Sequence, residues 1–283
     1  MPKKLWLFGF CLLLTGSLAP PMARLAAQEK APAPYSGEAE QIFDRMLQAM
    51  GGQALLDVAE MDGRGRIYSF NRGELSSAGD RFVYYSKLPG KERIEFGKKG
   101  NIAYVNAGDQ GWELDRQGIR EQTPEQIEDF QQSNRRDINN VLRFRARNEH
   151  IKLYLVGREF VDNRPVQILE LVDDRNESVK LYIDAGNYLP LQLRYRERDI
   201  LTREWLDVIE YYGKYITVQG IKTPMHIART RGNVRVFEAY FSELRYNSGV
   251  PDSLFTRESL EEDRKSTRLN SSHIQKSRMP SSA

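Results

Sequence analysis

The chain has 283 residues, a formal net charge of +3 and a single cysteine. The positive charge comes from the two ends, because residues 28–262 hold 34 Lys and Arg against 38 Asp and Glu, a net charge of −4. The clustered basic surface that nucleic-acid binding requires is therefore not indicated. One cysteine also excludes a disulfide framework.

The first residues have the pattern of a secretory signal. Lys3 and Lys4 precede an apolar run from Leu5 to Leu14, and a stretch of small residues ends at Ala27. The run is shorter than the roughly 20 apolar residues that span a bilayer, so we expect a cleaved signal peptide over residues 1–27 and a periplasmic protein. An uncleaved anchor is the alternative. Cys11 lies inside the apolar run and is not placed as a lipidation site.

A single folded domain is expected over residues 37–262, after a flexible tether rich in Ala and Pro over residues 28–36. Apolar residues at helical spacing from Ala39 to Met50 predict a helix that Gly51-Gly52 ends. This helix either packs on the core or binds a partner. Short strands are expected next, separated by turn signals, and they cover these segments: Gly65 to Phe70, Arg81 to Lys87, Glu92 to Phe96 and Ile102 to Asn106.

A helical insert follows at Thr123-Pro124-Glu125-Gln126, which is a capping box with proline at the first helical position. We predict two helices here, with a break near Ser133-Asn134. Strands resume at Ile151 and continue through Arg245. The order of four or five strands, helices and about six strands predicts one α+β domain.

The strands between Lys152 and Asn247 alternate between apolar and polar residues, as in an antiparallel sheet with one buried face. Leu181 and Ile183 lie in one strand and Leu193 and Tyr195 in the next. If these strands pair as a hairpin across Leu189-Pro190, the four side chains form one apolar patch. Trp112 and Phe237 are looser candidates for the same surface.

Residues 263–283 resemble a translated short-read sequencing adapter, from Asp263-Arg264-Lys265-Ser266 to the final Ala283. We expect this segment to be an artefactual, disordered tail that packs on nothing. The alternative is a genuine basic, Ser-rich disordered tail.

Catalytic and metal-binding patterns are weak. His150 and His226 are far apart in the sequence and have no second ligand at helical or strand spacing, so no metal site is predicted. Asp173-Asp174 precedes Arg175-Asn176 and is typical of a hairpin turn. Gly63-Arg64-Gly65 lacks the following helix and the Gly-Lys-Ser/Thr of a phosphate loop. We therefore predict a protein that is not an enzyme and binds no cofactor.

The order of several local patterns resembles the LolA/LolB-like family of bacterial periplasmic lipoprotein carriers. The resemblance spans most of residues 28–262 and rests on these segments: Ala49-Met50-Gly51-Gly52, Gly108-Asp109-Gln110-Gly111-Trp112, Gly157-Arg158-Glu159-Phe160-Val161-Asp162, Leu181-Tyr182-Ile183-Asp184 with Leu189-Pro190, and Tyr211 to Pro224.

This resemblance implies an incompletely closed antiparallel β-barrel, a half-barrel, with helices covering its concave apolar face. It also implies a monomeric carrier of lipoprotein acyl chains or other lipids in outer-membrane lipoprotein sorting, with membrane-associated envelope proteins as further partners. We then expect part of the patch of Leu181, Ile183, Leu193 and Tyr195, with Trp112 and Phe237, to contact an acyl chain. The chain is longer than dedicated carriers and rich in Arg–Glu pairs. The alternative is therefore an envelope sensor or scaffold on the same fold that binds a protein partner through a sheet edge.

Overall fold

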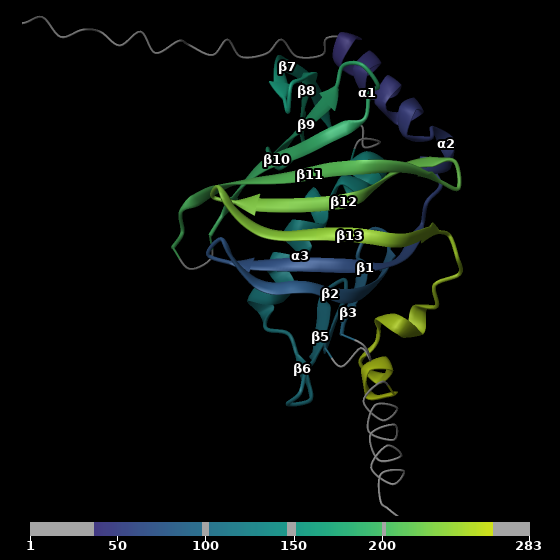
Figure 1. Cartoon of the computed structure of the whole chain (residues 1–283), viewed down its shortest axis with the longest axis vertical. Coiled ribbons are helices and arrows are strands. Elements are labelled where there is room, and N and C mark those ends of the chain that lie inside the picture. The colour runs from purple at the N-terminus through teal and green to yellow at the C-terminus, as the bar shows by residue number, and fades with distance from the viewer. Residues whose placement is uncertain (1–36, 98–101, 146–150, 200–201, 263–283) are drawn as a thin grey trace, which may run out of the picture. The chain divides into compact units, whose positions relative to one another are not determined.

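The computed structural model describes residues 37–97, 102–145, 151–199 and 202–262. The expected signal peptide, tether and C-terminal tail lie outside the described residues. The described unit is built on one antiparallel sheet of 13 strands, in the order β6-β5-β4-β3-β2-β1-β13-β12-β11-β10-β9-β8-β7. Strands β10 to β13, followed by β1 and β2, run side by side across the view of Figure 1.

Six strands precede the helical insert and seven follow it. The first six are β1 (Glu60–Asn71), β2 (Glu74–Lys87), β3 (Lys91–Phe96), β4 (Ile102–Ala107), β5 (Gln110–Leu114) and β6 (Ile119–Glu121). The other seven are β7 (Lys152–Val161), β8 (Arg164–Val172), β9 (Ser178–Asp184), β10 (Pro190–Arg198), β11 (Trp205–Val218), β12 (Ile221–Arg231) and β13 (Val234–Tyr246).

The sheet is open, because β6 and β7 lie at its two ends and do not pair with each other. Its two halves meet where β1 pairs with β13, so the first and last strands of the chain are neighbours in the middle of the sheet. The predicted α+β class and open antiparallel sheet are confirmed at this level. The sheet has more strands than expected, because β5 and the three-residue β6 add a further hairpin after β4.

The described parts of the chain contain few helices. They include α1 (Gly37–Met50), α2 (Gln53–Leu56), α3 (Pro124–Arg136), α4 (Ile138–Asn140) and a π-helical turn at Val141–Arg145. A 3₁₀ turn at Asp252–Phe255 follows the sheet, and residues 257–262 are helical. No helix in the described ranges has the length and apolar character needed to cross a membrane.

The expected helix starts and stops are largely confirmed. The capping box at Thr123 is present, with the Thr123 side chain accepting from the Gln126 N–H and the Gln126 side chain accepting from the Thr123 N–H. The break predicted near Ser133-Asn134 lies instead at Asp137. Its carboxylate accepts a hydrogen bond from the Asn139 N–H at 2.8 Å, which caps α4, whereas Ser133 and Asn134 continue α3.

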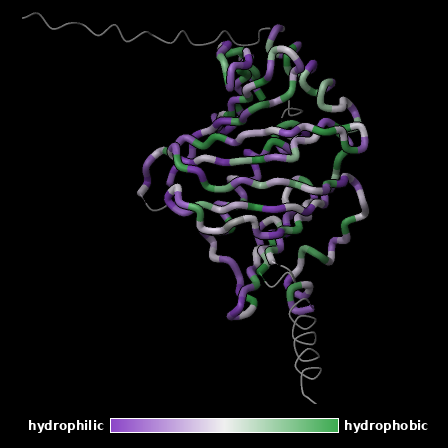
Figure 2. Tube along the Cα trace, in the orientation of Figure 1, coloured by the Kyte–Doolittle hydropathy of each residue, from purple (hydrophilic) through white to green (hydrophobic). Residues whose placement is uncertain are grey.

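The main buried core joins helices to strands. It contains apolar residues of α1, α4 and the π-helical turn together with residues of β8 to β12. A second, smaller core lies around β4 and β5 and includes Phe255 and Leu260. Apolar and polar positions alternate along the strands in Figure 2, as the sequence pattern predicts.

One face of the sheet carries a continuous row of side chains, which the strand registers define. In cross-strand order the row is Leu155, Leu169, Leu181, Leu193, Glu210, Arg229 and Phe237, from β7 to β13. We call the face that bears this row the inner face. It is apolar on β7 to β10, changes to an ion pair on β11 and β12, and becomes aromatic on β13.

Candidate functional site

A cavity of about 380 Å³ lies against the inner face of β1, β2, β3 and β11 to β13. We call it the central cavity. Met50 of α1, Leu55 of α2, Ile138 of α4 and Leu142 of the π-helical turn line it from the helical side. Its volume falls within the range of about 300–1,000 Å³ that small-molecule pockets occupy.

Aromatic side chains make up much of the strand wall. Phe82 packs edge-on against Phe241 at a centroid distance of 5.1 Å, and Tyr84 packs edge-on against the same ring at 6.4 Å. Room for these rings comes from glycine on β1. A Cβ at Gly63 would lie 3.0 Å from the Phe241 ring, and one at Gly65 would lie 2.1 Å from the Tyr240 carbonyl oxygen. The backbone of β1 therefore approaches β13 and its aromatic rings more closely than any other residue would allow.

An ion pair crosses the middle of the inner face. The Arg229 guanidinium donates to Oε1 of Glu210 from Nε at 3.0 Å and from a terminal nitrogen at 2.5 Å. The Tyr212 hydroxyl donates to the other oxygen of Glu210 at 2.6 Å. Arg229 also lies over the Phe237 ring, 5.4 Å from its centroid. The charge of Arg229 is thus already balanced by Glu210, and its hydrophobic face is covered by an aromatic ring.

Two further carboxyl groups face the cavity, from Glu92 of β3 and from Asp137 between α3 and α4. No ion pair joins either carboxyl to a cation in the parts of the chain that the structure describes. Burial raises the pKa of Glu92 to about 7, and the negative charge of Asp137 adds to the rise. Burial also raises the pKa of Asp137, with Glu210 as the second cause. Asp137 therefore acts on Glu92, and Glu210 acts on Asp137, where burial strengthens the effect of each charge.

Tyr84 and Arg143 also lie close to these carboxyl groups and have a part in the electrostatics of the site. The Tyr84 hydroxyl forms a hydrogen bond with the Glu92 carboxyl, which opposes part of the rise in its pKa. Arg143 lies behind the lining, where its guanidinium donates to the Leu55 carbonyl at 2.8 Å and to the Asn139 side chain at 2.9 Å. Burial lowers the pKa of Arg143 to about 10.

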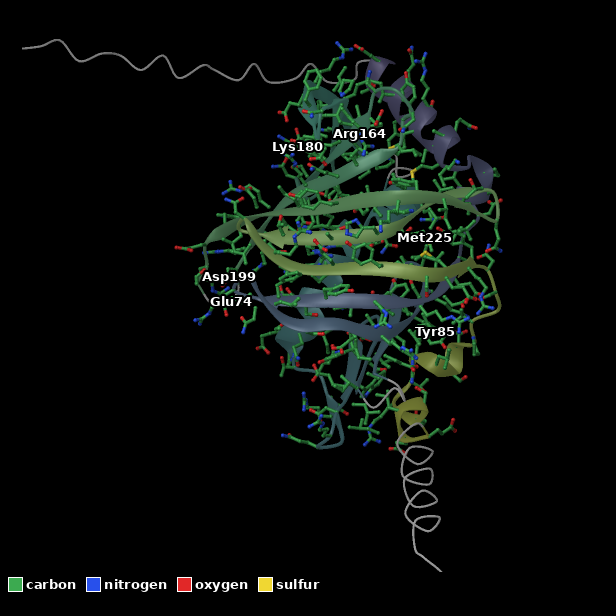
Figure 3. All side chains as sticks on the ribbon, viewed as in Figure 1. Glu74, Tyr85, Arg164, Lys180, Asp199 and Met225 are labelled. Atoms are coloured by element: carbon green, nitrogen blue, oxygen red, sulfur yellow. The ribbon has the colours of Figure 1, made fainter. Side chains whose placement is uncertain are left out.

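A second hollow of about 790 Å³ has a different character. It lies near the last β9–β10 pair, Lys180 with Arg194, and its walls include Glu177, Arg196 and Asp207. Charged side chains of both signs line it, among them Lys180, which is labelled in Figure 3. Charged walls of this kind favour water and ions as contents of the hollow and disfavour a hydrocarbon chain. We therefore take the smaller, more apolar central cavity as the candidate site.

The predicted hairpin is present, and Leu181 and Leu193 face each other across β9 and β10. Leu181, Ile183 and Leu193 are fully buried in the main core, and Tyr195 is buried with them. None of the first three lines the central cavity, whereas Phe237 does. Tyr195 lines the charged hollow.

Trp112 of β5 packs against the second core and is not brought to the central cavity. His226, on the opposite face of β12, stacks on Tyr240 at a centroid distance of 4.4 Å. In the described ranges, no group of three or more His, Cys, Asp and Glu side chains is placed to hold a metal ion.

The sequence analysis missed the charged residues of the cavity. A signal for two of them was present. Glu210 lies in phase with Val208 and Tyr212, and Arg229 lies in phase with Ile227, so each places a charge at a position of the buried face. Such positions seldom carry unpaired charges. Nothing comparable distinguishes Glu92 or Asp137.

No family model matches the sequence, and no curated protein matches it. Among solved structures, the chain is similar to a DUF1329 family protein from Desulfovibrio piger, with a TM-score of 0.56 and 15% identity over 78% of this chain and 98% of that one. It is also similar to a putative outer membrane lipoprotein-sorting protein domain from Vibrio parahaemolyticus, with a TM-score of 0.51 and 15% identity over 78% and 99%. A LolA superfamily protein from Nitrosomonas europaea aligns with 17% identity over 78% and 99%, at a TM-score of 0.49. The chain thus shares its fold with an outer membrane lipoprotein-sorting domain, as the LolA-like patterns in its sequence imply.

Proposed function

We propose that this protein binds the hydrocarbon chain of a lipid or of a lipoprotein in the central cavity and carries it through the periplasm. The observation that supports this most directly is the cavity itself, a largely apolar and aromatic space of about 380 Å³ between the inner face and residues of α1, α2, α4 and the π-helical turn. In this proposal the helices cover the concave face and keep the bound chain from water.

The energetic need is large. Each methylene group exposed to water costs about 0.8 kcal/mol, so a carrier must enclose most of a chain to make it soluble. The lipoprotein-sorting description of the Vibrio structure, together with the signal-like start of the sequence, favours a periplasmic carrier in outer-membrane lipoprotein sorting. The reading as a binding protein, without enzymatic activity, follows from the same proposal.

The lipid-contacting residues are proposed accordingly. Phe237, a candidate from the sequence analysis, lines the cavity, and we propose that it contacts the bound chain. Leu181, Ile183 and Leu193 are expected to support the wall from the adjoining core, and Tyr195 and Trp112 carry no proposed contact.

The test is saturable binding of a chain in the cavity. The variant Ala239→Leu adds three carbon atoms to a buried residue that lines the cavity. The matched control is Ala54→Leu, which makes the same change at an exposed position of α2. We expect the wild type and Ala54→Leu to bind a fluorescent lipid with equal affinity and Ala239→Leu to bind it at least about tenfold more weakly.

Circular dichroism must show both variants folded. Native mass spectrometry of protein purified from a bacterial periplasm should also show co-purified lipid. Equal affinity of all three proteins would contradict a site in this cavity.

A second candidate function, a sensor or scaffold, is favoured by one observation. β7 is an end strand of the open sheet, and Phe160 on it is 75% exposed. A strand at the end of a sheet with an exposed aromatic side chain is suited to binding an extended segment of a protein partner. Absence of saturable lipid binding by the folded wild type would favour this function over a carrier.

A further inference from the structure

The central cavity has charged side chains in addition to its apolar and aromatic wall. Its lining includes the acidic residues Glu92, Asp137 and Glu210 and the basic residues Arg229 and Lys222, of which Lys222 is exposed. Arg229 and Glu210 neutralise each other through two hydrogen bonds. Glu92 and Asp137 remain, one on β3 and the other at the start of α4. The guanidinium of Arg143, behind the lining, donates to Leu55 and Asn139 and not to either of these carboxyl groups.

An anionic end group is disfavoured by this arrangement. A fatty-acid carboxylate or a phosphate would meet two carboxyl groups, while the Arg229 guanidinium is engaged with Glu210 and the Lys222 side chain is exposed to water. Like charges in a space of low polarity repel strongly. An apolar end of the ligand beside Glu92 and Asp137 is also unfavourable, because it removes water from the two carboxyl groups and forms no hydrogen bond with them.

A cationic end group satisfies both conditions. A single positive charge between Glu92 and Asp137 supplies the opposite charge that the described structure does not supply by an ion pair. Tyr84 and Phe241 line the same cavity, and Tyr84 lies on β2, which pairs with the strand of Glu92, so aromatic rings lie near the place where a cation would bind. The cavity already holds one cation in this manner, since Arg229 lies over Phe237.

We propose that the central cavity selects amphiphiles whose polar end is a cation, a protonated amine or a quaternary ammonium group, and that Glu92 and Asp137 bind this end while the aromatic and aliphatic wall holds the chain. The inference rests on the proposed function, because it assumes that the cavity takes a hydrocarbon chain. It adds the charge of the end group and the two residues that recognise it.

The experiment compares three probes with the same chain: dodecyltrimethylammonium, dodecanol and dodecanoate. Each displaces a fluorescent lipid probe from the full chain at concentrations below micelle formation. We expect the ammonium probe to bind about tenfold more tightly than the alcohol, and the carboxylate to bind most weakly. Equal affinity of the carboxylate and the ammonium probe would overturn the inference while leaving the carrier function intact. If none of the three displaces the probe, the carrier function itself fails.

Three variants locate the effect. Glu92→Gln removes one cavity charge, and Asp137→Asn removes the other while keeping an oxygen to cap α4. Glu159→Gln removes a charge at an exposed position of β7 and is the matched control. We expect each cavity variant to lower the ammonium-to-alcohol preference at least about threefold, and the control to leave it unchanged. An unchanged preference in both cavity variants would overturn the inference.

The pH dependence supplies a readout that a purely structural role would not change. The trimethylammonium group keeps its charge at every pH, so a change in the preference reports on the protein. Tyr84 from β2, Asp137 from the helical side and Arg229 from β12 act on the Glu92 carboxyl. We expect the preference to fall as the pH is lowered from about 8 to about 5, because Glu92 takes up a proton. Glu92→Gln should remove most of this change, and a preference independent of pH in the wild type would contradict the assignment of Glu92.

Discussion

Replacing Arg229 with methionine tests the electrostatic design of the inner face. Methionine keeps much of the length and the apolar stem of arginine but removes its charge. Glu210, which is 3% exposed, then loses two hydrogen bonds and its counter-ion. Breaking a buried ion pair by removing one partner costs about 3–5 kcal/mol. The Arg229 side chain is itself 28% exposed, so screening by water places our expectation near the lower end, at about 3 kcal/mol.

The control is an exposed pair with the same geometry. Arg64 donates from two nitrogens to one oxygen of Glu243, and the two side chains are 66% and 40% exposed. Arg64→Met should therefore lower the free energy of unfolding by less than about 1 kcal/mol. Urea denaturation at neutral pH, followed by circular dichroism, measures both variants. A cost for Arg229→Met no larger than that for Arg64→Met would refute the reasoning.

A double variant separates the orphaned charge from lost packing. Glu210→Gln combined with Arg229→Met removes both charges and leaves an oxygen to accept from the Tyr212 hydroxyl. We expect the double variant to be more stable than Arg229→Met alone, because no uncompensated carboxylate remains buried. The Arg229 guanidinium also lowers the pKa of Glu92 and of Asp137. Its removal should raise both values, so Arg229→Met should regain stability as the pH falls toward about 5.

Three further predictions concern stability. In the wild type, the pKa of Glu92 is about 7 in the folded chain against an ordinary value near 4.5, so the folded state holds the proton more tightly and the free energy of unfolding should fall as the pH rises between these values. The full shift in pKa corresponds to about 3 kcal/mol of stability. We expect about half of this, because the carboxyl faces a cavity that water can enter. Glu92→Gln should flatten this part of the pH profile of stability, measured by urea denaturation. Gly65→Ala should lower the melting temperature by several degrees, since its Cβ would lie 2.1 Å from the Tyr240 carbonyl oxygen, whereas Gly90→Ala, with nothing within 4 Å, should not; equal effects would mean that β1 moves freely away from β13. Leu193→Glu should unfold the protein, because Leu193 is fully buried in the core and an unpaired charge there costs several kcal/mol; a native circular dichroism spectrum with a cooperative transition would contradict this.

The sequence predicts those parts of the fold that depend on neighbours along the chain. Helical spacing followed by Gly51-Gly52 locates α1, the box at Thr123 locates the start of α3, and period-two alternation gives the hairpin that pairs Leu181 with Leu193. Each of these is a local pattern with a local physical cause. β6 is too short, at three residues, to show an alternation. The break at Asp137 depends on a single side chain that caps α4. Several neighbouring residues in the sequence are equally polar, so the sequence does not single it out.

The site depends on pairing between distant strands, which the sequence does not specify. Glu92 and Arg229 lie on β3 and β12, and they share one cavity because β1 and β13 pair in the middle of the sheet. Phe237 was identified as a candidate and lines the cavity, but the same reasoning placed Trp112 beside it. An aromatic residue in a strand fits either face and either core equally well, so alternation alone does not assign it to a cavity.

The ion pair on β11 and β12 also bears on how the sheet finds its alignment. These strands have 14 and 11 residues and are joined at Gln219-Gly220, so many alignments would satisfy the backbone hydrogen bonds. A slip by one residue would turn Glu210 and Arg229 to opposite faces, and a slip by two in one direction would place Glu210 opposite Ile227 and Arg229 opposite Val208. Only the observed alignment brings the two charges together before the inner face closes over them. The pair therefore acts as a register mark for the β11–β12 hairpin, and through it for the strands that assemble on either side.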